Sequence, residues 1–160
     1  VDLPEYVPRP GNRKRFTQDD CAFLERSGLL RERYELIEGD VVVPMPQKIR
    51  HNRAVLLLVL WLTRIFGAVR VHSQATLDVD PTNRPEPDVF LAREPLPAER
   101  DYPRADEVAL VAEVSDTTLA DDLGVKAHLY ARAGIDEYWV LDVIGRRLLV
   151  HREPTAQGYG

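Results

Sequence analysis

The sequence predicts a single α/β domain, in which helices pack against one mixed β-sheet. Three observations support this prediction: the length of 160 residues, the short alternating apolar runs, and the longer segments with helical periodicity. A hydrophobic content of 44% is enough for one sizeable core. We expect an N-terminal arm over residues 1–15, the folded domain over residues 16–153 and a C-terminal tail over residues 154–160.

The first half of the chain predicts a helix, a hairpin and a second helix. Thr17 and Asp20 have the spacing of a capping box. The turn residues Gly39 and Asp40 separate two short apolar runs, as in a β-hairpin. The apolar stretch that ends at Phe66 is too long for a strand and predicts a largely buried helix. The expected bounds are residues 17–27 for the first helix, 34–38 and 41–45 for the hairpin, and 50–66 for the second helix.

The second half predicts five strands and one helix. Apolar and polar residues alternate after Phe66, and prolines precede the apolar run that begins near Asp88. Helical periodicity returns late in the chain and ends at Gly134, and the last two strands flank Gly145. The expected strands are residues 69–79, 85–91, 108–114, 137–143 and 147–151, and the expected helix is 119–133.

Composition excludes several classes of protein. A single cysteine, Cys21, allows no intramolecular disulfide and fits a reducing, cytoplasmic compartment. No apolar run is long enough to cross a bilayer, and residues 1–12 lack the pattern of a secretory signal. A net charge of −5 argues against an indiscriminate nucleic-acid coat protein, although a site rich in carboxylates fits it. No phosphate-binding glycine motif is present, so we expect no nucleotide cofactor.

A carboxylate interrupts an otherwise apolar strand at Glu113, within the run from Ala109 to Ser115. An isolated ionised carboxylate is costly in apolar surroundings, so it must be protonated, paired or bound to a cation. Asp88 poses the same problem, because it follows Pro87 at the head of another apolar run. Two carboxylates on neighbouring strands would form an oxygen-rich site of the kind that Mg²⁺ and Mn²⁺ favour.

The helix after Glu113 supplies a cation for the same place. Asp122 and Lys126 are four residues apart, which puts them on one helical face together with Tyr130. We expect Lys126 to point toward the strand ends. A cation there helps to orient a water nucleophile and stabilises charge that develops on a phosphate.

Several further motifs occur in order along the chain. They are Tyr34-Glu35-Leu36-Ile37-Glu38-Gly39, His51, Pro85-Glu86-Pro87-Asp88-Val89, Glu113-Val114-Ser115, Thr118, Asp122, Lys126, Tyr130, Gly134-Ile135-Asp136-Glu137-Tyr138-Trp139 and Asp142. Each motif alone is weak, but the ordered set is specific. From Phe16 to about Arg152 the chain resembles the Uma family, a large bacterial family of putative restriction endonucleases in the PD-(D/E)xK nuclease superfamily.

The resemblance implies a restriction-endonuclease-like core, in which Asp88 is the acid of the PD element and Glu113 the acid of the (D/E)xK element. Ser115 stands where many superfamily members have their lysine. The resemblance implies that Lys126, on the following helix, takes that role. Asp88, Glu113 and the main-chain carbonyl of Val114 are then the expected ligands of Mg²⁺ or Mn²⁺.

Three residues are expected to assist: Glu35, His51 and Asp122. Glu35 and Glu38 lie on opposite faces of a strand, so at most one of them faces the site, and Glu35 matches the more characteristic family position. A lone histidine near a helix start, such as His51, is more often a cap or a satisfied core residue than a base.

Each principal residue also has a structural interpretation. Pro-Asp is a common turn dipeptide, so Asp88 alone could cap a turn. A buried ion pair with an arginine could compensate Glu113. Lys126 and Asp122 could form a surface helix pair worth about 0.3–0.5 kcal/mol. The family resemblance favours the metal site over these alternatives.

The predicted function is hydrolysis of DNA phosphodiester bonds by a metal-dependent endonuclease. Two basic clusters are expected to contact phosphates: Arg13, Lys14 and Arg15, and Lys48, Arg50 and Arg53. Cutting both strands needs two active sites, so we expect a homodimer, with the segment after Asp142 and the apolar strands as its interface. The alternative is a nuclease-like fold that no longer cuts and serves as a dimeric binding module. The acidic net charge and Ser115 are consistent with it, whereas the retention of Asp88, Glu113 and Lys126 together argues against it.

Overall fold

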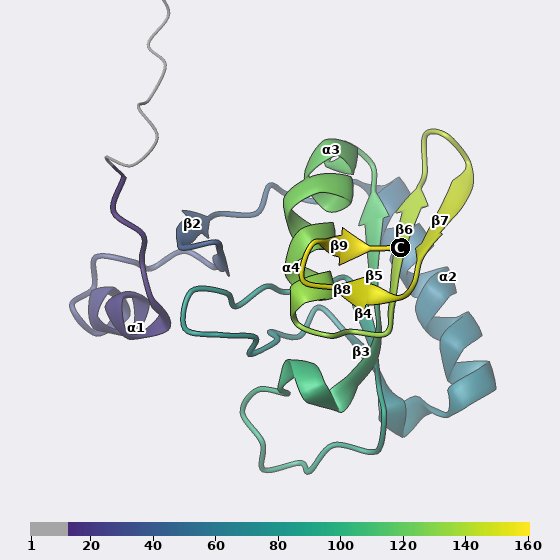
Figure 1. The fold of residues 1–160 in the computed structure, drawn as a ribbon, viewed down its shortest axis with the longest axis horizontal. Coiled ribbons are helices and arrows are strands. Elements are labelled where there is room, and N and C mark those ends of the chain that lie inside the picture. The colour runs from purple at the N-terminus through teal and green to yellow at the C-terminus, as the bar shows by residue number, and fades with distance from the viewer. Residues whose placement is uncertain (1–12) are drawn as a thin grey trace, which may run out of the picture.

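A mixed five-stranded β-sheet lies at the centre of the structure, a computed structural model that describes residues 13–160 (Figure 1). Residues 1–12, most of the expected N-terminal arm, lie outside the described residues. The strand order is β3-β4-β5-β6-β7, and within this sheet only β5 and β6 pair in parallel. The strands are Val71–Ser73 (β3), Val89–Ala92 (β4), Val108–Ser115 (β5), Glu137–Asp142 (β6) and Arg147–His151 (β7). The predicted mixed α/β architecture is confirmed.

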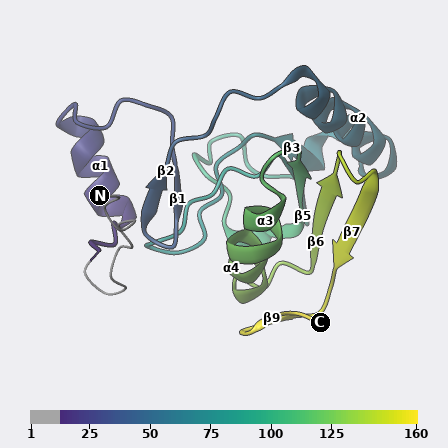
Figure 2. The same cartoon turned by 90° about the horizontal axis from the view of Figure 1, so that it is seen from above.

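Helices lie on both faces of this sheet (Figure 2). The longest, α2, packs on one face, mainly against β3, β4 and β5. On the other face, α3, a π-helical turn η3 and α4 follow one another without a break, where the sequence predicted one helix. The helix α1 begins at the predicted capping box of Thr17 and Asp20, which is confirmed. The helical bounds are Gln18–Arg26 (α1), Ile49–Phe66 (α2), Ala68–Arg70 (η1), Ala105–Glu107 (η2), Leu119–Asp121 (α3), Asp122–Lys126 (η3) and Ala127–Arg132 (α4).

Alternation along the strands divides the buried apolar side chains into two clusters, one on each face of the sheet. Beneath α2, Val55 and Leu62 pack against strand residues that include Val89 and Val114. On the opposite face, α4 packs its residues Leu129 and Tyr130 onto a second set, which includes Phe90, Val111, Tyr138 and Val140. The sheet is thus buried from both sides over β4 and β5.

Two small hairpins lie outside the central sheet. The first, β1 (Glu35–Ile37) and β2 (Asp40–Val42), has the predicted position. Its two-residue turn is Glu38 and Gly39, both with positive φ, rather than Gly39 and Asp40. The hairpin forms its own two-stranded sheet instead of joining the central one. The second, β8 (Pro154–Thr155) and β9 (Gly158–Tyr159), packs on α4 in the segment expected as a tail.

Two further expectations about local structure were wrong. The strand expected over residues 69–79 is limited to Val71–Ser73, because Gln74 adopts a positive φ of 50° and ends the ladder. The helix α2 is not largely buried, since only His51, Val55 and Leu62 are buried within it. No helix among residues 13–160 is long and apolar enough to span a membrane.

Candidate active site

An open cleft of about 760 Å³ contains the residues that the sequence singled out. One wall is the hairpin β1–β2 with the connector that follows it, residues 43–48, and the other is the turn after β5. The start of α2 contributes His51, and the floor is formed by Asp88, Glu113 and Lys126. The structure therefore brings the three predicted catalytic residues together.

Asp88 stands directly before β4, at the point where the chain enters the sheet. Its Oδ2 accepts a hydrogen bond from the backbone N–H of Val114 at 2.8 Å. His51 Nε2, from the first turn of α2, lies 3.1 Å from the same oxygen. Burial alone would lower the pKa of His51, but the hydrogen bond and charge of Asp88 outweigh it and raise that pKa.

Glu113 lies within β5 and is only 3% exposed. Its Oε1 accepts hydrogen bonds from Lys126 Nζ at 3.0 Å and from the Tyr130 hydroxyl at 2.9 Å. Its Oε2 accepts a weaker one from the backbone N–H of Asp88 at 3.4 Å. The backbone of one predicted acid thus contacts the side chain of the other, although 25 residues separate them in the sequence.

Lys126 stands at the end of the π-helical turn η3, where it faces three carboxylates. Besides Glu113, its ammonium lies 3.7 Å from Glu35 Oε2 and 3.9 Å from Asp122 Oδ1. Burial would lower the pKa of Lys126, but the charges of Glu113, Glu35 and Asp122 outweigh it and raise that pKa. Lys126 is therefore a fixed cation. π-Turns within helices often occur at functional sites.

The carboxylates of this cluster have perturbed acidity. Burial is the largest cause that raises the pKa of Glu113 to about 8, opposed by Lys126 and reinforced by Asp88, Asp122 and Glu35. Burial also raises the pKa of Glu35, which Lys126 opposes. Of the hairpin pair, Glu35 is buried in the cleft, whereas Glu38 pairs with Arg132 outside it. Perturbed acids in a cleft are candidates for function.

Three hydroxyl groups near the site were not singled out from the sequence as site residues. Ser115 and Thr118 donate hydrogen bonds to Asp122 Oδ2, at 2.5 and 2.6 Å. They fix Asp122 in place beside Lys126. The third is Tyr130, for which the sequence indicates a position four residues after Lys126 but no role. The shared helical face was the signal that could have identified it.

The donor set at the cleft floor fits a divalent cation of the magnesium type. The described residues contain no cluster of three or more His, Cys, Asp or Glu side chains arranged to hold a metal. Mg²⁺ needs fewer than three such side chains, because it keeps several water ligands and is usually bound through one or two carboxylates. In a β-strand, the N–H and C=O of one residue point to the same edge. Since the N–H of Val114 points to Asp88, its carbonyl points to that side as well.

Most of the basic residues expected to contact phosphates are already paired with acids. Arg13 and Arg15 both pair with Asp40, and Lys14 pairs with Asp20. Arg50 pairs at 2.6 Å with Asp116, which lines the cleft. The two remaining residues, Lys48 and Arg53, have no ion pair to any acid in the described part of the chain.

Comparisons with known proteins agree with the sequence and the fold. The structure resembles the crystal structure of a putative nuclease belonging to DUF820 from Anabaena variabilis, with a TM-score of 0.66 and 19% sequence identity. The match covers 88% of this chain and 80% of that one, so the nuclease-like fold is shared. No curated protein matches the sequence. The model of the Uma2 family, described as putative restriction endonuclease, matches residues 24–160, and the chain therefore belongs to this family.

Proposed function

We propose that this protein is a metal-dependent nuclease that hydrolyses phosphodiester bonds in DNA. The observation that carries the proposal is the convergence of Asp88, Glu113 and Lys126 on the floor of one open cleft. Two acids supply oxygen ligands, and the lysine supplies a positive charge that its carboxylate neighbours stabilise.

Asp88, Glu113 and the main-chain carbonyl of Val114 are the residues that would hold Mg²⁺ or Mn²⁺. When bound, the cation supplies Lewis acidity to a water molecule and offsets negative charge on the scissile phosphate. The chain itself orients these ligands. His51 and the Val114 N–H hold Asp88, and the Tyr130 hydroxyl holds Glu113.

Lys126 acts as a charge stabiliser rather than as a proton acceptor, because its raised pKa keeps it protonated at neutral pH. Its ammonium orients the attacking water and stabilises the charge that accumulates on the phosphate oxygens. Asp122, held by Ser115 and Thr118, and Glu35 from β1 keep the ammonium between them.

Family membership is the basis for proposing DNA as the substrate. The phosphates of the DNA would contact the two basic side chains that form no ion pair within the described residues, Lys48 and Arg53. Lys48 lines the cleft, and Arg53 is exposed on α2 close to it. Cleavage of both strands of a duplex would use two copies of the site, one from each subunit of a homodimer. We therefore propose a dimeric enzyme.

A plasmid-cleavage assay with Mg²⁺ and with Mn²⁺ tests the function. We expect metal-dependent conversion of supercoiled DNA by the wild type. The rate should fall at least about 100-fold in each of Asp88→Ala, Glu113→Ala and Lys126→Ala. Glu94→Ala and Arg26→Ala alter an exposed acidic and an exposed basic residue outside the cleft and should cleave like the wild type. Cleavage that persists unchanged in Glu113→Ala would refute the site.

A nuclease-like module that binds but does not cut is the second candidate. The contact that favours it is the 3.0 Å pair between Lys126 and Glu113, because an internal cation already compensates the acid. Calorimetric titration with Mn²⁺ separates the two. The enzyme should bind the ion with an affinity that Asp88→Ala abolishes, whereas the non-cutting module should show no binding in either protein.

A further inference from the structure

One face of the central sheet is only half covered. The helix α2 packs mainly on β3, β4 and β5, whereas β7 keeps the apolar side chains of Leu148 and Val150 exposed. The opposite face is covered by α4 and the hairpin β8–β9, so the two faces differ.

The open half of this face is apolar. The register pairs Trp139 directly with Val150 and Leu141 with Leu148, so these four side chains project from one side of the sheet. Trp139 and Leu141 pack against the cluster beneath α2, which identifies that side. Leu148 is 46% exposed and Val150 is 40% exposed. We call these four residues the β6–β7 shelf.

The helix beside the shelf presents apolar side chains outward as well. Leu57, Trp61 and Ile65 follow one another at intervals of four residues and are 58%, 50% and 53% exposed. The ring centroids of Trp61 and Trp139 lie 5.9 Å apart, so this stripe and the shelf form one continuous surface. On the next stripe of α2, Leu56 and Leu60 are equally exposed. The helix contains no acidic residue.

From this surface we infer that the chain forms a two-fold symmetric homodimer, in which α2 of each copy lies on the β6–β7 shelf of the other. Within residues 13–160 the chain carries both halves of the contact: an apolar helix without a cover and a half-sheet without a helix. A patch that pairs with itself in this way closes under two-fold symmetry.

The seven exposed apolar side chains of the helix stripes and the shelf also favour a second copy. Single soluble chains rarely expose a continuous apolar patch of more than a few hundred Å². A standard interface buries about 800 Å² per partner around a core enriched in large apolar and aromatic side chains. The stripe and the shelf together supply such a core, with a tryptophan from each element at its centre.

This arrangement leaves the cleft accessible. The residues of α2 that line the cleft end at Asn52, and the apolar stripe begins at Leu57, more than one helical turn later. Each subunit therefore keeps its own site. The dimer does not depend on the proposed nuclease activity, and its test needs no substrate or metal.

Light scattering coupled to size exclusion tests the inference. We expect the wild type at micromolar concentration to have twice the mass of the 18.2-kDa chain. Leu57→Glu and Leu148→Glu, one on each element, should each give the monomer mass, because each places two charges in the symmetric interface. Far-UV circular dichroism and the melting curve should show that both variants remain folded, since both side chains are about half exposed.

Leu29→Glu is the matched control, because Leu29 is 74% exposed and follows α1, away from the shelf. It should remain a dimer. A wild type that is monomeric at these concentrations overturns the inference. So does a dimer that both Leu57→Glu and Leu148→Glu leave intact, or one that Leu29→Glu dissociates to the same extent. If one of the two variants fails to fold, the other decides the outcome.

Discussion

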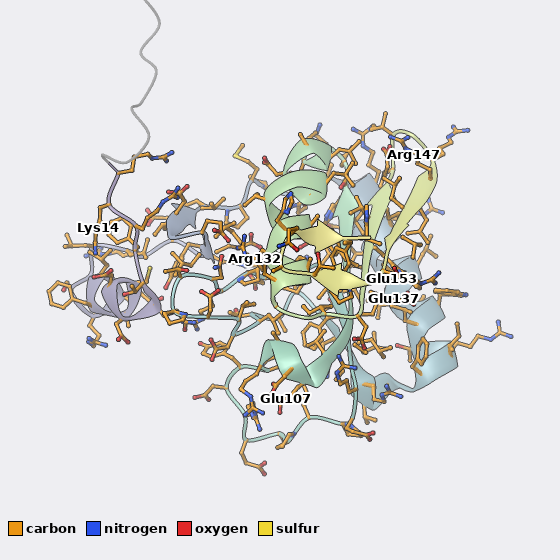
Figure 3. The ribbon with its side chains drawn as sticks, in the orientation of Figure 1. Lys14, Glu107, Arg132, Glu137, Arg147 and Glu153 are labelled. Carbon is orange, nitrogen blue, oxygen red and sulfur yellow. The ribbon has the colours of Figure 1, made fainter. Side chains whose placement is uncertain are left out.

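Glu113 and Asp142 are buried carboxylates on the adjacent parallel strands β5 and β6, and their surroundings differ in kind. Asp142 is compensated by the turn that follows it and by the first residue of the next strand, β7. Its Oδ1 accepts from the backbone N–H of Gly145 and its Oδ2 from Arg147 Nε, both at 2.8 Å. Those two hydrogen bonds, that of Gly145 first, lower the pKa of Asp142. Arg147 itself extends outward from the start of β7 (Figure 3).

The partners of Glu113 come from elements that are distant in sequence, and burial raises its pKa instead. Its carboxylate meets an ammonium, a phenol and a backbone amide on the floor of an open cleft. Burial of an acid is therefore not by itself a sign of function. Local compensation that lowers the pKa indicates a structural role, whereas incomplete compensation beside a cleft indicates a role toward a ligand.

Glu113→Gln should show the larger effect. The amide keeps the shape of the side chain and its acceptor for Tyr130, but loses the charge that a divalent cation needs. We expect metal-dependent plasmid cleavage to fall at least about 100-fold. The melting temperature should be kept or rise, since a raised pKa means that the ionised form is the costly one at neutral pH. Wild-type cleavage in this variant would contradict the assignment.

Lys126→Met should reduce cleavage by about 100-fold, because it removes the cation that stabilises phosphate charge. Since Lys126 lowers the pKa of Glu113, its loss should also raise that pKa above about 8. Carbon-13 NMR of the Glu113 carboxyl in metal-free protein, followed from pH 6 to 10, measures the shift. A pKa that is unchanged in Lys126→Met would show that the 3.0 Å contact does not set the acidity of Glu113.

The sequence predicted the elements whose signals are local. The capping box of α1, the β1–β2 hairpin and the final strand pair follow from patterns within a few residues, and all are present. The predicted strand over residues 69–79 failed, because a positive φ at Gln74 depends on contacts that alternation does not encode. The burial of α2 was overestimated, because apolar content does not reveal how many neighbours surround a helix.

The site was predicted only in part, because some of its residues have local signals in the sequence and others are recognised only by long-range contacts. A charge within an apolar strand is visible in the sequence, so Glu113 was found, and the family pattern indicated Asp88 and Lys126. The contacts of His51 with Asp88 and of Tyr130 with Glu113 join elements that only the fold brings together. The locations of Asp142, Gly145 and Arg147 within six residues could have indicated a self-compensated turn.

His51→Ala should have a smaller effect than the loss of Glu113, because His51 acts through Asp88. We expect the affinity for Mn²⁺ to fall by roughly 10- to 100-fold, as is typical when a residue that orients a metal ligand is removed. Cleavage should recover at higher Mn²⁺ concentration, which a folding defect would not allow. The exposed His128→Ala is the matched control and should bind Mn²⁺ like the wild type.

Asp142→Asn should affect stability and leave cleavage unchanged. Because the folded protein lowers the pKa of Asp142, its carboxylate stabilises the fold above the ordinary value of 3.8, and this contribution is lost as the pH falls through the lowered pKa. The variant should therefore melt below the wild type at pH 7, and the two curves should converge as the pH drops below about 3.8. Thermal melts of both proteins at pH 7 and below pH 3.8 measure this difference in melting temperature. A loss of metal-dependent cleavage at pH 7 in folded Asp142→Asn would show that both buried acids serve the site, and the distinction between local and incomplete compensation would fail.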